Sequence, residues 1–183
     1  TLGFDSEADG FFEFVADRCQ DGSDLQVMYG LGGERDLTES VLPNLAGYEN
    51  AQPVRIGNAA YEQDQHDVWG ALLDSVYLNA KPRDRLSERV WPIVVAQIEK
   101  AIEHWHEADR GIWEVRGEPR HFTSSKMFCW VALDRGARLA GITKLAKADL
   151  VGGHALRQRQ HRTLRGCTHR AAGIGPQERT RPK

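Results

Sequence analysis

The chain has 183 residues, of which 40% are apolar and 27% are charged, and its formal net charge is −2. This composition is typical of a soluble globular protein, and no run of 18 apolar residues exists that would cross a membrane. Three scattered cysteines do not make a disulfide framework or a metal knuckle, and their odd number favours a reducing compartment. We therefore expect a cytoplasmic protein with no metal site and no cofactor.

The charges are divided unevenly along the chain. Residues 1–143 hold 14 Lys and Arg against 24 Asp and Glu, whereas residues 144–183 hold 10 against 2. This division predicts a folded domain at 1–143 and a basic tail at 144–183, largely disordered beyond Val151 because its apolar periodicity is weak. Such a tail can bind nucleic acid or an anionic membrane, but without an amphipathic face or aromatic residues it is better explained as a non-homologous end. We expect neither partner.

The first half of the domain alternates helical and loop-like patterns. A helix is expected from Asp5 to Cys19. The long Gly- and Pro-rich connection that follows, to Asn58, is expected to hold one short strand at Leu25 to Tyr29. A connection of this length is usually functional.

Three further helices are expected in the second half. Apolar residues at three- and four-residue steps predict helices from Ala59 to about Asn79 and, after Pro82, from Leu86 to His106. The short connection between them favours an antiparallel pair. A last helix is expected to begin at Ser124 or Ser125. The fold class is therefore all-α with long loops between helix pairs, and these patterns alone leave open a toroid or a helical solenoid.

The loop between the last two helices carries the strongest chemical signal. Trp113, Glu114 and Arg116 follow one another between Gly111 and Gly117. An indole beside a carboxyl group lowers the local polarity and favours the protonated form, as a general acid needs. The alternative is an ordinary loop carboxylate that pairs with a neighbouring arginine of the same loop.

Short motifs over about residues 5–140 extend this signal. They are Asp24–Gly30, Glu34–Leu37, Pro53–Ala60, Gly111–Glu114, Arg120–Thr123 and Trp130–Arg135. Together they resemble the bacterial branch of glycoside hydrolase family 15, which includes glucoamylase-like and trehalase-like proteins. The resemblance covers an internal piece of the family's catalytic domain, so the chain is expected to begin inside a longer protein.

The resemblance implies a fold and a reaction. The fold is a partial (α/α) toroid, a fragment of a barrel of six helical hairpins whose active site lies where the long loops meet. Glu114 corresponds to the general acid of an inverting hydrolysis of α-linked glucosides, either α-1,4-glucans or trehalose. Inversion needs a second carboxylate roughly 6.5–9.5 Å from the acid. The family's general base and its upstream sugar-binding residues have no counterpart here, so the chain by itself is expected to be weakly active or inactive.

Seven other residues are candidates for binding the substrate. Trp113 is expected to stack on a sugar ring or to anchor the loop. Arg116 is expected to orient the carboxylate or a sugar hydroxyl, or to pair with Glu118 on the surface. His121 and Lys126 enter through the resemblance only. The full substrate-binding set is Trp113, Arg116, His121, Lys126, Arg55, Asn58 and Gln63.

Two other readings of the whole chain stay open. The first is a non-catalytic helical module that binds carbohydrate or another protein. The second is a product that does not fold stably, because half a toroid exposes the apolar faces of its inner helices. The oligomeric state cannot be argued from these residues.

Overall fold

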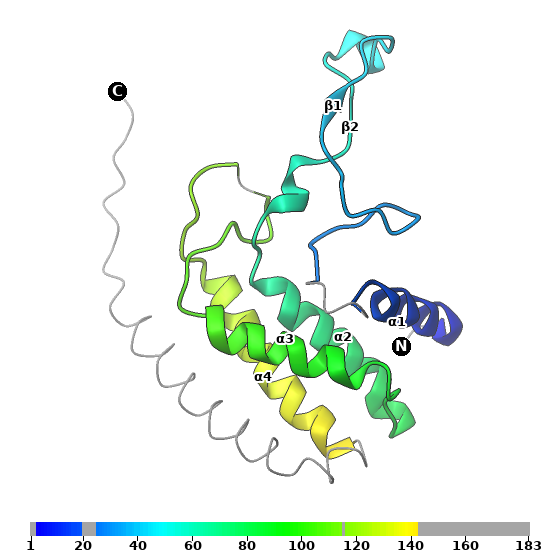
Figure 1. The fold of residues 1–183 in the computed structure, drawn as a ribbon, viewed down its shortest axis with the longest axis vertical. Coiled ribbons are helices and arrows are strands. Elements are labelled where there is room, and N and C mark those ends of the chain that lie inside the picture. The colour runs from blue at the N-terminus through cyan, green and yellow to red at the C-terminus, as the bar shows by residue number, and fades with distance from the viewer. Residues whose placement is uncertain (1–2, 20–24, 115, 143–183) are drawn as a thin grey trace.

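The computed structural model describes residues 3–19, 25–114 and 116–142, and the predicted basic tail lies outside them (Figure 1). The described part is mainly helical, and none of its helices is long and apolar enough to cross a membrane. In chain order the elements are α1 (Asp5–Cys19), β1 (Ser40–Val41), η1 (Tyr48–Asn50), β2 (Arg55–Ile56), η2 (Ala59–Glu62), α2 (Asp67–Arg83), α3 (Trp91–His104) and α4 (Thr123–Ile142), where η marks a 3-10 helix.

Three helices form the body of the molecule. Figure 1 shows α2 and α3 running in opposite directions with α4 packed along them, while α1 lies to one side. The predicted all-α class and the antiparallel pair are both confirmed. The arrangement is that of a partial (α/α) toroid, with the long connections gathered at one end of the helices.

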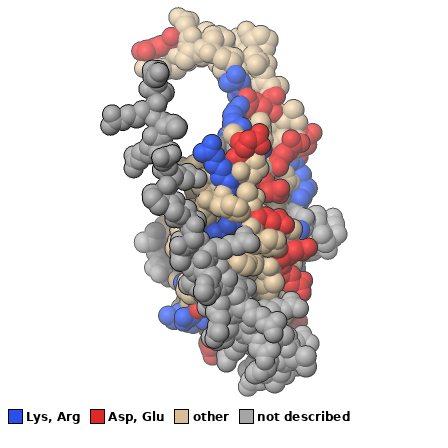
Figure 2. Space-filling view, turned by 90° about the vertical axis from the view of Figure 1, so that its left-hand side faces the viewer, with Lys and Arg blue, Asp and Glu red and all other residues tan. Residues whose placement is uncertain are grey.

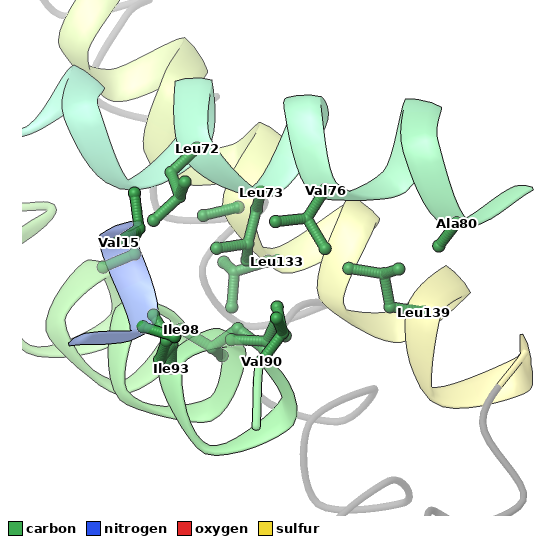
Figure 3. Close-up of a cluster of buried hydrophobic side chains, with 14 of the residues drawn as sticks. Val15, Leu72, Leu73, Val76, Ala80, Val90, Ile93, Ile98, Leu133 and Leu139 are labelled. Carbon is green, nitrogen blue, oxygen red and sulfur yellow. The ribbon is translucent and has the colours of Figure 1, made fainter. Parts of the chain in front are cut away.

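The core lies between these helices and is made of aliphatic side chains. Leu73 from α2, Ile98 from α3 and Leu139 from α4 are each 1% exposed or less. Figure 3 shows them in one cluster with Val15, which α1 contributes. Burying a side chain of this size contributes about 1.5–3 kcal/mol to stability. The apolar residues whose spacing predicted the helices therefore also stabilise the packing of these helices.

The backbones of α2 and α4 approach each other closely at Gly70. A Cβ atom added there would lie 2.1 Å from the carbonyl oxygen of Phe128, which belongs to the backbone of α4 and has no room to move aside. The absence of a side chain at Gly70 therefore allows α2 and α4 to lie this close together.

Several predicted boundaries are wrong. Leu25 to Tyr29 form no strand; the Gln26 side chain instead donates to the carbonyl of Arg35, and Tyr29 packs edge-on against Phe14. In the part of the chain that the structure describes, the two strands form a two-residue antiparallel pair, with Ser40 opposite Ile56. They form because residues 40–56 fold back on themselves, which alternation within a single segment does not predict.

The helix limits also differ from the prediction. The helix expected from Ala59 is split into η2 and α2, because Gln63 takes an extended conformation, with φ −80° and ψ 140°. Pro82 lies inside the last turn of α2, which ends at Arg83 before a left-handed Asp84. The helix expected from Leu86 begins only at Trp91, although Leu86 still packs on the core. Met127, although apolar, is 54% exposed on α4.

The hairpin formed by β1 and β2 projects from the body (Figure 1). Of the apolar side chains on it, Tyr48 is 85% and Val41 50% exposed. Figure 2 shows the projecting end as mostly uncharged, whereas acidic and basic side chains are interspersed over the described surface below it. The hairpin is fixed to the body at its base, through contacts with the Glu114 loop that are described below.

A buried polar cluster lies where α2 and α4 begin. The carboxylate of Asp109, which is 1% exposed, accepts hydrogen bonds from the backbone N–H of His66 at 3.0 Å and from the hydroxyl of Ser125 at 2.7 Å. The His66 ring is stacked on Trp69, with 4.8 Å between ring centroids. Burial lowers the pKa of His66, against the opposing charge of Asp109, because the charged imidazolium is poorly solvated there.

Replacing Gly70 by Ala tests the close approach of α2 and α4. The new methyl group meets backbone, so the free energy of unfolding should fall by at least about 1–3 kcal/mol. Gly10→Ala is the matched control, since Gly10 is a helical glycine of α1 with nothing within 4 Å of an added Cβ. That variant should be stabilised by about 0.5–1 kcal/mol. Urea unfolding followed by circular dichroism measures both, and equal effects would contradict this account of the packing.

The buried His66 predicts a pH-dependent stability. Because its folded-state pKa lies below the unfolded value of about 6.5, the unfolded chain binds more protons between the two values. This contribution to stability is fully present above about pH 6.5 and is lost as the pH falls below it, with a slope of at most about 1.4 kcal/mol per pH unit. Asp67 acts in the opposite sense, since burial raises its pKa.

The variant His66→Phe keeps a ring against Trp69 and removes the titration. Urea unfolding between pH 5 and 7.5 should show a weaker loss of stability on acidification in His66→Phe than in the parent chain. Asp67 is present in both chains, so its effect largely cancels in the comparison. His106→Gln, which removes a more exposed histidine, is the control for the loss of a histidine as such. Identical curves for the parent and His66→Phe would refute the prediction.

Candidate active site

The loop that carries Glu114 is closed at its base by backbone hydrogen bonds. The N–H of Asp109 donates to the carbonyl of Arg120 at 2.9 Å, and the N–H of Arg120 donates back at 2.8 Å. Gly111 has φ +64°, and a Cβ there would lie 2.9 Å from the Phe122 ring. A residue without a side chain is therefore required where the loop turns against Phe122, just before α4, and the residues between Asp109 and Arg120 form one closed loop.

The Asp109 carboxylate attaches this closed loop to the helices. Through His66 and Ser125 it reaches the beginnings of both α2 and α4. A further backbone bond, from Arg110 N–H to the Asp64 carbonyl at 3.0 Å, fixes the loop to the segment before α2. Glu114 thus projects from a base whose position is set by two helices, although the residue itself lies on a loop.

Glu114 is exposed and has φ +51°, an uncommon left-handed conformation for a residue with a side chain. Its Oε2 accepts a hydrogen bond from the side-chain amide of Asn58, with 3.2 Å between Nδ2 and Oε2. Trp113 is 82% exposed. The expected low-polarity environment is therefore not formed by these neighbours in the described part of the chain, where the indole faces solvent.

Arg55 and Arg116 meet at a carboxylate that the sequence analysis did not identify. Glu39 binds Arg55 Nε at 3.0 Å and Arg116 at 2.8 Å. The hydrogen bond from Arg116 lowers the pKa of Glu39, and the charges of both arginines act in the same direction while desolvation opposes them. A purely local pattern would suggest that Arg116 pairs with Glu118 or Glu114. It pairs instead with Glu39, which directly precedes β1 at the base of the hairpin.

A cavity of about 460 Å³ lies beside the loop. Its lining includes the predicted site residues Gln63 and Arg116 together with Glu62, Asp64 and Arg110. A second cavity of about 460 Å³ lies between α1 and the turn joining α2 to α3, and none of the predicted site residues lines it. The volume of the first cavity falls within the range of small-molecule sites, about 300–1,000 Å³, and its lining includes residues of both the Glu114 loop and the segment before α2.

The remaining candidates lie at the edge of this arrangement. His121 is exposed, at the end of the loop. Lys126, in the first turn of α4, donates its ammonium group to the carbonyl of Glu107 and so helps hold the loop. Of the predicted site residues, Asn58 therefore contacts Glu114 directly, while Arg55 and Arg116 meet each other at Glu39.

Neither Glu39 nor Asp109 is among the residues that the sequence predicts for the site. Glu39 lies 77 residues before Arg116, so no local spacing reveals the pair. Asp109 offered a weak signal, an acidic residue just ahead of the loop, but its burial and its two partners depend on how α2 and α4 meet. Within the described residues, no group of three or more His, Cys, Asp or Glu side chains is arranged to hold a metal ion.

Comparisons with known proteins place the chain in a family. The sequence profile described as "Glycosyl hydrolases family 15" matches residues 1–173. The "Trehalase" of Mycobacterium tuberculosis is 62% identical over 144 residues, which cover 76% of this chain and 21% of that protein. The "Trehalase" of Mycolicibacterium smegmatis is also 62% identical over 144 residues, covering 76% of this chain and 22% of that protein.

More distant relatives show the same partial match. "Trehalase 1" of Sulfolobus acidocaldarius is 38% identical over 120 residues, or 64% of this chain and 22% of that protein. No solved structure matches. The chain spans about one fifth of the length of the relatives it matches. The profile match over most of the chain, the identity to the mycobacterial proteins and the helical architecture agree, and the chain belongs to glycoside hydrolase family 15.

Proposed function

We propose that the chain is part of a hydrolase that cleaves trehalose, with Glu114 as the general acid. The observation that carries the choice of trehalose over an α-1,4-glucan is the 62% identity over 144 residues to two proteins named trehalase. Glu114 supports the acid role by its place at the tip of a loop anchored to two helices, with one carboxylate oxygen held by Asn58.

The proposed reaction is a single displacement. Glu114 gives its proton to the oxygen that joins the two glucose units, the bond from that oxygen to the anomeric carbon breaks, and a water oxygen attacks the same carbon from the opposite face. A second carboxylate takes a proton from that water, so one trehalose and one water yield two glucose molecules. Arg116 and Arg55, held by Glu39, are proposed to donate hydrogen bonds to sugar hydroxyls beside the acid.

The chain alone is proposed to be a poor catalyst. The openness of Glu114 and Trp113 supports this, because water competes for every hydrogen bond at an unshielded site. The lack of a candidate general base in the sequence supports it further, since one acid-base group contributes about 10²- to 10⁴-fold to the rate. The remaining active-site residues are proposed to lie in a part of the full protein that corresponds to the unmatched four fifths of the relatives.

The competing function is a non-catalytic module that binds sugar. The exposed indole of Trp113 and the cavity beside Gln63 favour it, because neither feature needs a general base to be useful. The two functions differ in what an added nucleophile does. Azide attacks the anomeric carbon without first losing a proton while the bond to the bridging oxygen breaks, which gives one glucosyl azide and one glucose. It therefore replaces the missing base only where a working acid protonates that oxygen.

Glucose release from trehalose by the 183-residue chain, with and without azide, tests the proposal. The parent chain should release glucose slowly, and azide should accelerate the release. Glu114→Gln, which cannot give up a proton, should lower the azide-assisted rate by about 10²- to 10⁴-fold. Glu118→Gln is the matched control in the same loop and should behave as the parent.

Three results would overturn parts of the proposal. An unchanged rate in Glu114→Gln would remove Glu114 as the acid. An azide-free rate within the ordinary enzyme range of about 1–10³ per second would show that the site is complete in this chain. If trehalose shifts the backbone amide signals in the ¹H–¹⁵N spectrum of the chain but azide-assisted cleavage is absent, the non-catalytic binding module is favoured.

A further inference from the structure

We propose that Asn58 is a positioning residue for Glu114: its amide, fixed in one orientation by η2, occupies Oε2 and leaves Oε1 as the oxygen that delivers the proton. This inference deepens the proposed function and rests on it. It also replaces the direct sugar contact that the sequence suggested for Asn58 with a role that acts through the acid.

The orientation of the Asn58 side chain follows from its own hydrogen bonds. Asn58 is the N-cap of η2, and its Oδ1 accepts from the backbone N–H of Ala60 at 3.0 Å. A backbone N–H cannot accept a hydrogen bond, so the amide nitrogen cannot exchange places with Oδ1 without losing the cap. Nδ2 must therefore point the other way, and Glu114 Oε2 lies there at 3.2 Å.

The backbone of Asn58 is fixed as well. Its N–H donates to the carbonyl of Leu37 at 2.9 Å, and its carbonyl accepts from the N–H of Tyr61 at 3.1 Å. The amide thus extends from a residue held on both sides of the chain, and it is half-buried. Because the Asn58 amide is fixed, its hydrogen bond favours one position of the Glu114 carboxylate.

The hydrogen bond makes the two oxygens of Glu114 unequal. An amide N–H can only donate, so the oxygen that it contacts is favoured as the acceptor and disfavoured as the carrier of the proton. The transferable proton is then on Oε1. Since Glu114 lies on an exposed loop in a left-handed conformation, a fixed partner limits the rotation of its side chain, and misplacing a catalytic group by about 1 Å can cost 10²-fold in rate.

The segment of Asn58 and the Glu114 loop are also joined by a second contact. It allows an effect on the position of Glu114 to be distinguished from an effect on folding. Arg116, two residues after Glu114, binds Glu39, and Glu39 also binds Arg55 near Asn58. The hairpin base and the Glu114 loop are therefore joined independently of the Asn58 amide. Changing only the amide should leave the two segments together while releasing the carboxylate.

The test uses two variants of Asn58 that keep the cap and remove the donor. Asp and Ser are both good N-cap residues, so Asn58→Asp and Asn58→Ser retain an oxygen for Ala60 N–H. Neither presents an amide to Glu114, and Asp places a second acceptor there. In azide-assisted trehalose cleavage we expect kcat to fall by about 10- to 100-fold with KM within twofold, and Asn58→Asp to be the more impaired. A sugar-contact role would instead raise KM.

A second measurement does not depend on activity. In ¹H–¹⁵N spectra, the side-chain amide protons of Asn58 should shift when Glu114 is replaced by Ala, and should not shift in the control Glu118→Ala. Unshifted Asn58 amide protons in Glu114→Ala would overturn the inference whatever the activity. An unchanged kcat in both Asn58 variants would do the same. If Glu114→Gln does not lower the azide-assisted rate while the Asn58 amide protons still shift in Glu114→Ala, the proposed function is refuted but the contact between Asn58 and Glu114 is supported.

Discussion

The buried carboxylate of Asp109 connects the loop that carries Glu114 to the two longest helices of the described chain. It accepts the N–H of His66 before α2 and the hydroxyl of Ser125 in α4, and its backbone closes the loop against Arg120. A buried donor left without an acceptor costs about 1–3 kcal/mol, so removing this carboxylate would unpair two donors at once. The position of Glu114 therefore depends on a buried carboxylate that is not among the predicted site residues.

The packing of α2 against α4 supports this anchor. Gly70 allows the two backbones to approach closely, and that approach brings the start of α2 to the start of α4, where His66 and Ser125 meet Asp109. The aliphatic core stabilises the helices, while the polar cluster at their ends determines where the connecting loop begins. This division is typical of enzymes whose functional groups lie on loops over a rigid scaffold.

The site surface is assembled from two segments that are distant in the sequence. Residues 39–58 contribute Glu39, Arg55 and Asn58, and the loop contributes Glu114 and Arg116. Two separate contacts join the segments: the ion pairs of Glu39 and the hydrogen bond from Asn58 to Glu114. Each contact independently restricts how the segments lie relative to each other. Glu114 and Trp113 themselves stay exposed beside these contacts.

The sequence by itself determined the helical class, the approximate helices and the Gly-flanked loop of Glu114, because apolar periodicity and turn residues act over a few neighbouring positions. The motifs, taken together, also determined the family. Only the tertiary structure decided that Asn58 meets Glu114 across 56 residues, that Arg116 pairs with Glu39 across 77, and that Trp113 faces solvent. These contacts depend on how α2 and α4 pack and how residues 40–56 fold back, and no local spacing encodes either.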